Sequence, residues 1–321
     1  MFPVSPDQGA IAVLTTPVEP LGPVFVKRDD RVNPRYGGNK PRKLRRLLAE
    51  ARSAGARRVV TFGAAGSHHA LATALFGRSL GLDVTAVLTP QPRSDHAVEV
   101  LRALVAQGAR VLPVPWTHPP ALGPVVAALR SSWIIPPGGS TVEGALGFVD
   151  AAAELRRQID QGLLPCPDVI VVATGSGGTA AGLAAGLARE GLPCRVRAVA
   201  VARPVAPLAA HLRALAAATA RRLGLGVASV VGRLEVDTEH VGPGYGHPSP
   251  LTAAALALAA EAGLPVDPTY TAKALASALA EAGRGRVVLY WHTLSSAPLE
   301  PLLREAPAEH QLPAELRALL V

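Results

Sequence analysis

The sequence predicts an α/β protein built on mostly parallel sheets. Short runs rich in valine and isoleucine alternate with longer segments rich in alanine and leucine, which is the order expected of repeated strand–helix–strand units. The chain has 321 residues, of which 49% are hydrophobic, so it is long enough to form two domains with cores of their own.

Strands are predicted where β-branched runs are bounded by turn residues, and helices where the alanine- and leucine-rich segments are longer. The predicted strands are 24–27, 59–62, 84–88, 110–114, 133–135, 169–173, 196–201 and 287–291. The predicted helices are 40–54, 67–80, 95–107, 122–129, 141–161, 179–189, 204–222, 251–262, 272–282 and 297–304. The proline-rich segment 113–120 is predicted as a long loop.

The composition argues against several classes of protein. The net charge is +8, but the arginines are scattered and aromatic residues make up 4%, so we expect no nucleic-acid binding. The most apolar helical segments, 208–220 and 251–264, are short and carry charged residues, so we expect no membrane span. Segment 1–9 lacks the features of a signal peptide and the two cysteines lack metal-ligand spacing, which favours a cytoplasmic protein.

Lysine is rare in this chain. Lys27, Lys40, Lys43 and Lys273 are the four lysines among 32 basic residues, and a lysine, unlike an arginine, can lose its proton and act as a nucleophile. Lys40 follows Gly37-Gly38-Asn39 at a predicted helix start, where the positive end of the helix dipole favours the neutral amine needed for a Schiff base. The same pattern, taken by itself, is also typical of a solvated surface lysine.

A glycine-rich turn joins the predicted strand 169–173 to the next helix. Backbone N–H groups in such a turn can approach an anion closely, and the helix start adds its unpaired donors. The turn lacks the Walker lysine and the acidic residue of a dinucleotide site, so a monophosphate is favoured over the cofactor of a nicotinamide-dependent dehydrogenase. A tight turn without a ligand remains the alternative. The turn residues are Gly175, Ser176, Gly177, Gly178 and Thr179.

Three further segments carry polar groups at turns. Ser67 is a natural helix N-cap whose hydroxyl and neighbouring N–H groups suit a carboxylate, with His68 and His69 as polar contacts. Adjacent histidines on a helix point about 100° apart, so we expect no metal site there. Tyr245 and Tyr270 follow turns and are either packed rings or, beside a cofactor, acid–base groups.

Taken in order, these segments resemble the fold-type II pyridoxal 5′-phosphate (PLP) enzymes of the D-cysteine desulfhydrase and 1-aminocyclopropane-1-carboxylate (ACC) deaminase family. The resemblance covers nearly the whole chain and joins a lysine to a monophosphate cradle, the two anchors that PLP requires. The segments that carry it are 26–30, 37–44, 67–69, 138–148, 175–179 and 267–271.

The resemblance implies a tryptophan synthase beta-like fold, with each domain an open, mostly parallel sheet flanked by helices. It implies a smaller domain at 54–146, a larger PLP-anchoring domain at 1–53 plus 147–321, and a homodimer. Lys40 is the expected Schiff-base residue and proton-transfer group, beside Asn39. The residues Gly175–Thr179 are expected to bind the phosphate, Ser67 to bind the substrate carboxylate, and Tyr245 and Tyr270 to line the substrate side of the ring.

Thr271 matches the position that faces the pyridine nitrogen, where ACC deaminases carry glutamate and desulfhydrase-like members carry threonine. A neutral hydroxyl cannot hold that nitrogen protonated as an acid does, which favours β-elimination from a small, D-cysteine-like amino acid to give a 2-oxo acid and ammonia. An ACC deaminase-type ring-opening deaminase and a PLP-binding protein without turnover are the alternatives. The chain departs from the family at Ser67-His68-His69, because the asparagine that normally follows the serine and contacts the cofactor is missing; His68 is expected to bind the cofactor in its place. It also departs at Leu294-Ser295-Ser296, which replaces a glycine pair.

Overall fold

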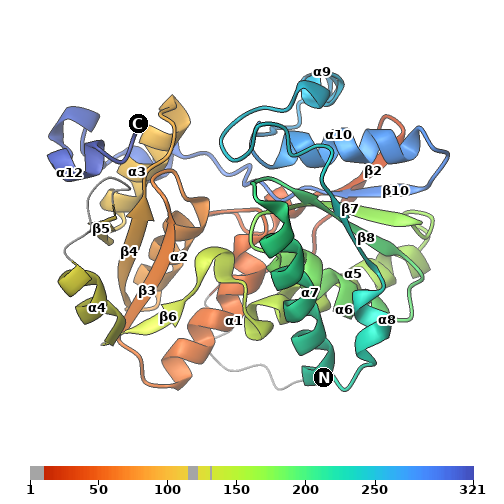
Figure 1. Ribbon diagram of the computed structural model, residues 1–321, viewed down its shortest axis with the longest axis horizontal. Coiled ribbons are helices and arrows are strands. Elements are labelled where there is room, and N and C mark those ends of the chain that lie inside the picture. Colours follow the sequence, from red (N-terminus) through yellow and green to blue (C-terminus); the bar gives the residue numbers. More distant parts are fainter. Residues whose placement is uncertain (1–10, 115–121, 131) are drawn as a thin grey trace. The chain divides into compact units, whose positions relative to one another are not determined.

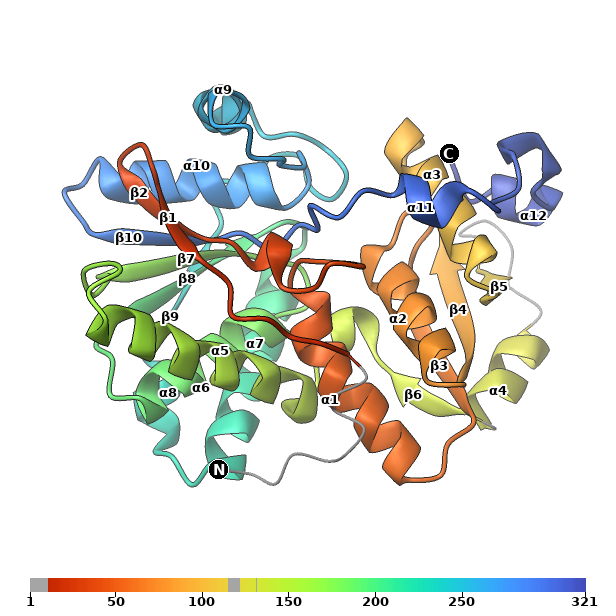
Figure 2. The ribbon, with the colours of Figure 1, turned by 180° about the vertical axis from the view of Figure 1, so that it is seen from behind.

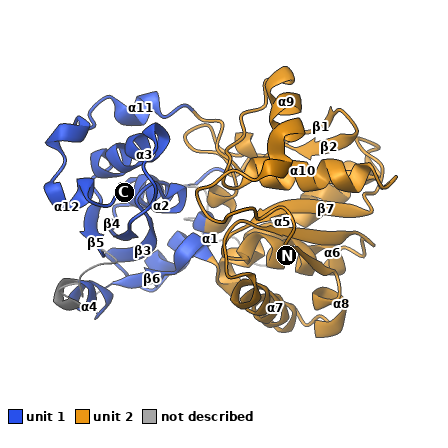
Figure 3. Ribbon diagram, turned by 45° about the horizontal axis from the view of Figure 1, so that its top comes forward, with its two compact units in different colours: residues 1–12, 44–139, 298–321 blue, residues 13–43, 140–297 orange. Residues whose placement is uncertain are grey.

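The computed structural model describes residues 11–114, 122–130 and 132–321. The N-terminal segment 1–9 and most of the predicted loop 113–120 therefore lie outside the described residues. The chain divides into two compact units, which Figure 3 shows in different colours. Unit 1 consists of residues 1–12, 44–139 and 298–321, and unit 2 consists of residues 13–43 and 140–297.

Unit 2 is built on a six-stranded sheet. Its strands, in spatial order, are β1 (Val18–Leu21), β2 (Val24–Lys27), β10 (Val288–Trp291), β7 (Val169–Thr174), β8 (Arg195–Ala200) and β9 (Leu234–Asp237). Strand β1 pairs with β2 in antiparallel orientation, and the other neighbours are parallel. The carboxyl ends of β2, β10, β7 and β8 therefore meet at one edge, where ligands bind in open parallel sheets.

Helices cover both faces of this sheet (Figure 1). Alternate strand residues point to opposite faces, so Ile170 packs with one set of helices and Val171 with the other. One set is α5 (Val142–Asp160), α6 (Gly178–Arg189), α7 (Val205–Arg222) and α8 (Val227–Val231); the other is α9 (Ala253–Glu261) and α10 (Thr271–Ala282). Because both faces are buried, the strands are nearly continuous apolar runs, as the sequence indicated.

Unit 1 has a four-stranded parallel sheet in the order β5 (Arg110–Pro113), β4 (Asp83–Thr89), β3 (Arg58–Ala64) and β6 (Trp133–Ile135). Helix α2 (His68–Ser79) packs on β3 and β4 and against α3 (Asp95–Ala106), as Figure 2 shows. Helix α4 (Leu122–Arg130) packs on the sheet through Ala128, beside Val60 and Val87. The C-terminal segment, with α11 (Glu300–Leu303) and α12 (Ala314–Arg317), joins this unit through a bridge from Gln91 to Leu320.

A buried ionic network fixes the start of helix α1 (Lys40–Ser53) within unit 2. Arg42 donates to both Asp29 oxygens at 2.9 and 2.7 Å and to Glu154 Oε2 at 3.0 Å. Lys27 also donates to Glu154, and the Trp291 indole donates to Asp29 Oδ2 at 2.7 Å. Because each buried charge has an opposite partner and further hydrogen bonds, the network is tolerated in a core and holds the first turn of α1 in one orientation.

The predicted α/β architecture is confirmed: both sheets are mostly parallel and flanked by helices. Each predicted strand has a counterpart with ends shifted by at most about two residues. The described helices include no segment that is long and apolar enough to cross a membrane.

Candidate functional site

The turn between β7 and α6 forms a cradle for an anion, and its backbone shape and close contacts require glycine. Gly177 has φ +88°, a conformation that side chains disfavour, and it immediately precedes α6. A Cβ added at Gly178 would lie 2.7 Å from Ser140 Oγ and 3.1 Å from Lys43 Nζ, closer than carbon atoms normally come to such groups. The start of α6 is therefore lined by a hydroxyl and an amine, the donors that suit an anion.

Ser140, which precedes α5, ties that helix to the cradle. Its Oγ accepts a hydrogen bond from the Gly178 amide at 3.1 Å and donates to Ser176 Oγ at 2.7 Å. In the sequence, Gly138-Gly139-Ser140 stands out only as part of the family resemblance, and Ser140 is not among the predicted site residues. Its position follows from the pairing of α5 with α6, a contact between distant segments that spacing along the chain does not reveal.

Lys40 and Lys43 lie one turn apart on α1. Burial lowers the pKa of Lys40 to about 8, although the Asp267 carboxylate opposes the shift. Burial and the nearby Lys40 charge lower the pKa of Lys43 to about 7. A substantial fraction of both amines is thus neutral near physiological pH. Lys43 stands out in the sequence as a rare lysine but is not among the predicted site residues.

Asn39 presents an unused acceptor next to Lys40. Its Nδ2 donates to Thr179 Oγ1 at 3.0 Å, which links α1 to the glycine-rich turn across 140 positions of sequence. Its Oδ1 is buried and finds no hydrogen-bond partner among the described residues. A buried acceptor without a donor is costly, so this atom points to a polar ligand group beside Lys40.

Asp267 organises the start of α10, which carries Tyr270 and Thr271. Its carboxylate accepts hydrogen bonds from the amides of Thr269, Tyr270 and Thr271. It also accepts the Thr271 hydroxyl proton, at 2.7 Å from Oγ1 to Oδ2. The Thr271 side chain is neutral and nearly inaccessible to solvent, and its hydroxyl proton is already donated to Asp267.

Tyr245 and Tyr270 form an edge-to-face pair with ring centroids 5.8 Å apart and planes at 87°. Burial raises the pKa of Tyr245, against a hydrogen bond from Tyr270 that lowers it. Burial raises the pKa of Tyr270 as well. A Cβ added at Gly175 would lie 3.2 Å from Cε1 of Tyr270, so the pair stands directly against the glycine-rich turn. Both hydroxyls are protonated near neutral pH.

The remaining predicted site residues belong to unit 1. Ser67 is the N-cap of α2 and accepts a hydrogen bond from the Ala70 amide at 3.2 Å. His68 Nε2 lies 2.8 Å from His96 Nε2, while His69 is buried in the same helix. Among the described residues there is no group of three or more side chains placed to hold a metal ion. The carboxylate-binding role of Ser67 and the contacts assigned to the two histidines stay predictions.

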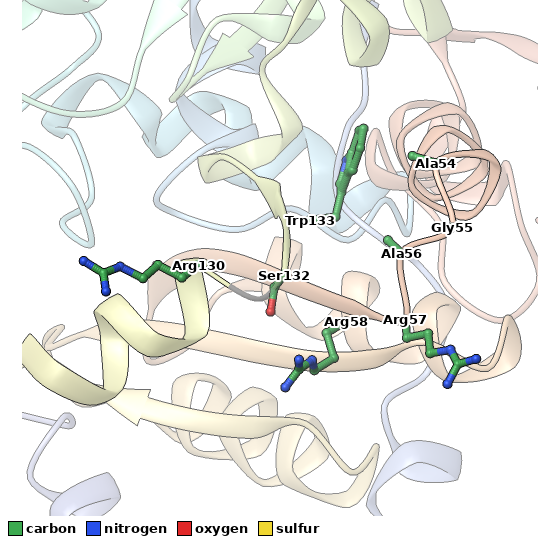
Figure 4. Close-up of a pocket in the computed structure, with 8 residues that line it drawn as sticks. All are labelled: Ala54, Gly55, Ala56, Arg57, Arg58, Arg130, Ser132 and Trp133. Carbon is green, nitrogen blue, oxygen red and sulfur yellow. The ribbon is translucent and has the colours of Figure 1, made fainter.

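A pocket in unit 1 is a weaker candidate. Figure 4 shows it at the amino ends of β3 and β6, opposite to the carboxyl end of β3 that leads to Ser67. Its arginines, Arg57, Arg58 and Arg130, extend away from one another rather than converging. The pocket therefore lacks the convergent polar groups of a binding site.

Comparison with known proteins identifies the family. Residues 11–293 match the family described as pyridoxal-phosphate dependent enzyme. The chain belongs to this family. The nocardicin C-9′ epimerase of Nocardia uniformis subsp. tsuyamanensis is 38% identical over 91% of this chain and 93% of the relative. The D-cysteine desulfhydrase of Klebsiella pneumoniae subsp. pneumoniae is 35% identical over 79% of each protein. A crystal structure of an ACC deaminase homologue matches with a TM-score of 0.75 and 28% identity, covering 94% of this chain and 99% of the other.

The site fits the cofactor of this family. Pyridoxal phosphate needs an amine for its aldehyde, an anion cradle for its phosphate and donors or acceptors around its ring. Unit 2 offers Lys40 with a lowered pKa, a glycine-rich helix start beside Lys43, and the unpartnered acceptor of Asn39. The enzyme is thus a pyridoxal-phosphate dependent enzyme related to D-cysteine desulfhydrases and ACC deaminases.

Proposed function

We propose that the enzyme is a lyase that removes a β-substituent and the amino group from a small, D-cysteine-like amino acid. The products are the free leaving group, such as hydrogen sulfide, a 2-oxo acid and ammonia. The observation that carries the proposal is the neutral, solvent-shielded Thr271 beside Asp267, together with the similarity to D-cysteine desulfhydrases.

Lys40 is the proposed cofactor-bearing and proton-transfer residue. When bound, pyridoxal phosphate supplies an electron sink for the carbanion that forms at Cα. The Lys40 amine, freed when the amino acid takes its place, accepts the Cα proton. Its pKa of about 8 suits this task, because a base with a pKa near the working pH is both available and strong enough.

The phosphate is assigned to the cradle at the start of α6. The backbone amides of residues 175–179 and the Ser176 and Thr179 hydroxyls would donate to it, and Lys43 would add a cation when protonated. The unpartnered side-chain oxygen of Asn39, Oδ1, would accept a hydrogen bond from a polar ring substituent next to Lys40. These contacts hold the ring still, so that the proton is taken from one defined face.

The two tyrosines are proposed to stabilise the leaving group as it departs. Because burial keeps Tyr245 and Tyr270 protonated, either would donate a hydrogen bond to a departing thiolate. Thr271 would offer the ring nitrogen of the bound cofactor no negative charge of its own, which would favour prompt loss of the β-substituent. Water then converts the released enamine to the 2-oxo acid and ammonia.

Epimerisation at Cα is the second candidate, and it is supported by the 38% identity to nocardicin C-9′ epimerase. Both reactions begin with the same proton transfer at Lys40. They differ in the next step: an epimerase returns a proton to the opposite face of Cα, whereas a lyase breaks a bond at Cβ. Ring opening of ACC, the third candidate, rests on the likeness to the ACC deaminase homologue.

One experiment separates these reactions. The holoenzyme is incubated in D₂O with D-cysteine, L-cysteine, β-chloro-D-alanine, a D-amino acid without a leaving group, and ACC. Production of 2-oxo acid and ammonia is measured along with Cα deuteration and optical rotation. We expect pyruvate from D-cysteine and β-chloro-D-alanine. Inversion of the D-amino acid without 2-oxo acid would establish an epimerase instead, and 2-oxobutyrate from ACC alone would establish a deaminase.

The Lys40→Ala variant tests the role of Lys40, and Lys27→Arg is its control. Lys40→Ala should lose the visible absorbance band of the lysine-bound cofactor and every turnover, whereas Lys27→Arg, a buried lysine of the structural network, should keep the band. If the holoenzyme shows the band but turns over none of these compounds, the protein binds the cofactor without catalysis, and the lyase assignment is refuted.

A further inference from the structure

Lys273 is a buried cation that the cofactor site does not use. It lies on α10, two residues after Thr271, and its side chain is inaccessible to solvent. Its Nζ donates to the carbonyl oxygens of Val241 and Gly244, each at 2.8 Å, and approaches the Val201 oxygen at 3.5 Å. All three acceptors are backbone carbonyls in loops of unit 2.

This arrangement differs from that of Lys27, another fully buried lysine, which has a carboxylate partner in Glu154. Within the described part of the chain, Lys273 forms no ion pair with an aspartate or glutamate. Burial lowers its pKa, and the more distant Asp267 opposes the shift. A buried ammonium is expensive unless its donors are satisfied, so the carbonyls and the lysine depend on each other for their hydrogen bonds.

The carbonyls of Val241 and Gly244 belong to the loop that presents Tyr245, whereas Val201 follows strand β8. Gly244 directly precedes Tyr245 and has φ +133°, a conformation that other residues rarely adopt, so the loop needs a specific support to keep this shape. An exposed side chain, Arg203, also donates to the Gly242 oxygen of this loop at 3.1 Å, and the His247 amide donates to the Gly244 oxygen at 3.4 Å. Lys273 is the buried side chain that holds this loop, through hydrogen bonds to the carbonyl oxygens of Val241 and Gly244.

The same helix supplies the partner ring. Tyr270 is the residue before α10 begins, and Lys273 is one turn further along. Lys273 therefore ties the Tyr245 loop to the element that carries Tyr270, and the two rings pack nearly perpendicular to each other.

We propose that Lys273 is the positioning residue for Tyr245: its ammonium clamps the loop at Val241 and Gly244 and sets where the Tyr245 hydroxyl stands relative to Tyr270. The inference rests on the proposed function in one respect, because it takes Tyr245 to line the substrate side of the site. A shift of the loop by about 1 Å would misplace the proton donor and slow the step that needs it.

The test is hydrogen–deuterium exchange of the holoenzyme, which requires no substrate. In Lys273→Met the amides of residues 241, 242 and 244–246 should exchange at least about tenfold faster, because the loop opens locally without its clamp. Ser277→Ala is the control: Ser277 is equally buried on α10 but bonds to Asp237 and Arg197. Its loop exchange should match that of the parent protein. Unchanged loop exchange in Lys273→Met would overturn the proposal.

Kinetics supply a second readout. Lys273→Met should keep the cofactor absorbance band and lower kcat by about tenfold to a hundredfold with a smaller change in KM. In a Tyr245→Phe background the same substitution should have an effect under about twofold, because the group that it positions is already gone. Additive effects of the two substitutions would contradict the proposal. If no amino acid is turned over, the proposed function fails while the exchange experiment still decides the role of Lys273.

A second variant keeps the proposal testable if Lys273→Met folds poorly. Lys273→Gln retains two N–H donors for the carbonyls and should show an intermediate increase in loop exchange. If neither variant yields folded holoenzyme while Ser277→Ala does, Lys273 serves folding as a whole, and the positioning role is refuted.

Discussion

The Thr271 hydroxyl donates to the Asp267 carboxylate while the Asp267 amide donates back to Thr271 Oγ1, each at 2.7 Å. This reciprocal pair ends the loop after α9 and starts α10. It fixes the backbone on either side of Tyr270, and it places the Asp267 charge close enough to Lys40 to affect its pKa. Local helix capping and the chemistry of the site are therefore coupled through one side chain.

Replacing Asp267 separates these two effects. Asp267→Ala removes an acceptor of three amides and should lower the free energy of unfolding by about 1–2 kcal/mol. Asp267→Asn keeps a capping acceptor and should cost less, but it removes the negative charge that raises the pKa of Lys40. Thermal unfolding measures the first effect. Equal losses of stability in the two variants would contradict the capping role.

Attachment of the cofactor to the apoenzyme should depend on pH through Lys40. Only the neutral amine reacts with the aldehyde, and the pKa of Lys40 is lowered to about 8. The attachment rate should rise about tenfold per pH unit below pH 8 and level off above it. Rapid-mixing absorbance measures the rate, and Asp267→Asn should shift the profile to lower pH. A midpoint above pH 10 would mean that Lys40 is an ordinary solvated lysine.

Gly178→Ala tests the phosphate cradle. The new methyl group would crowd Ser140 Oγ and Lys43 Nζ and occupy space at the start of α6. We expect affinity for pyridoxal phosphate to fall by about tenfold to a hundredfold, roughly 1.4–2.8 kcal/mol, as measured by equilibrium dialysis. Gly226→Ala is the matched control, since its Cβ would meet only Ser229 Oγ at 3.5 Å and its φ is −61°. Equal affinities for both variants would exclude the cradle as the phosphate site.

Glu154→Gln tests the buried network at the start of α1. Burial alone would raise the pKa of Glu154, but Arg42 and Lys27 lower it to about 2. Burial lowers the pKa of Lys27 in spite of Glu154, so Arg42 is the cation that accounts most for the low value. Loss of the carboxylate leaves two buried cations, Arg42 and Lys27, with the single negative charge of Asp29 between them, and stability at pH 7 should fall by about 3–5 kcal/mol.

The same carboxylate predicts a pH dependence with a definite sign. Because the pKa of Glu154 is lower in the folded protein than its ordinary value of 4.5, its contribution to stability is complete above pH 4.5. That contribution is lost as the pH falls from 4.5 towards 2. Denaturant unfolding across this range should show a steeper loss in the parent protein than in Glu154→Gln, and parallel curves would contradict the assignment.

The sequence predicted the buried strands well because fully buried parallel strands are continuous apolar runs, such as residues 169–173. It missed β1 and β9, which are four-residue edge strands, and β9, Leu234-Glu235-Val236-Asp237, alternates apolar with acidic residues. At an edge, neighbouring strands rather than composition decide whether such a segment pairs.

For the site, the sequence indicated Lys40 and the glycine-rich turn through local motifs. It did not indicate Ser140, Lys43 or Lys273, because their contacts join segments that are far apart along the chain. The scarcity of lysine was the available signal for two of these three. It suggested unusual chemistry for the amines, and the structure shows that one of them instead serves as a buried donor to backbone carbonyls.

The order of strands in unit 2 has a consequence for biosynthesis. Strand β10 lies between β2 and β7 in the sheet, although both of these neighbours are translated well before β10. Unit 1 likewise includes residues 298–321, which are translated after its other segments. Neither unit can complete its hydrogen bonding until these segments have left the ribosome. Until then the unpaired edges of β2 and β7 are exposed to misassembly.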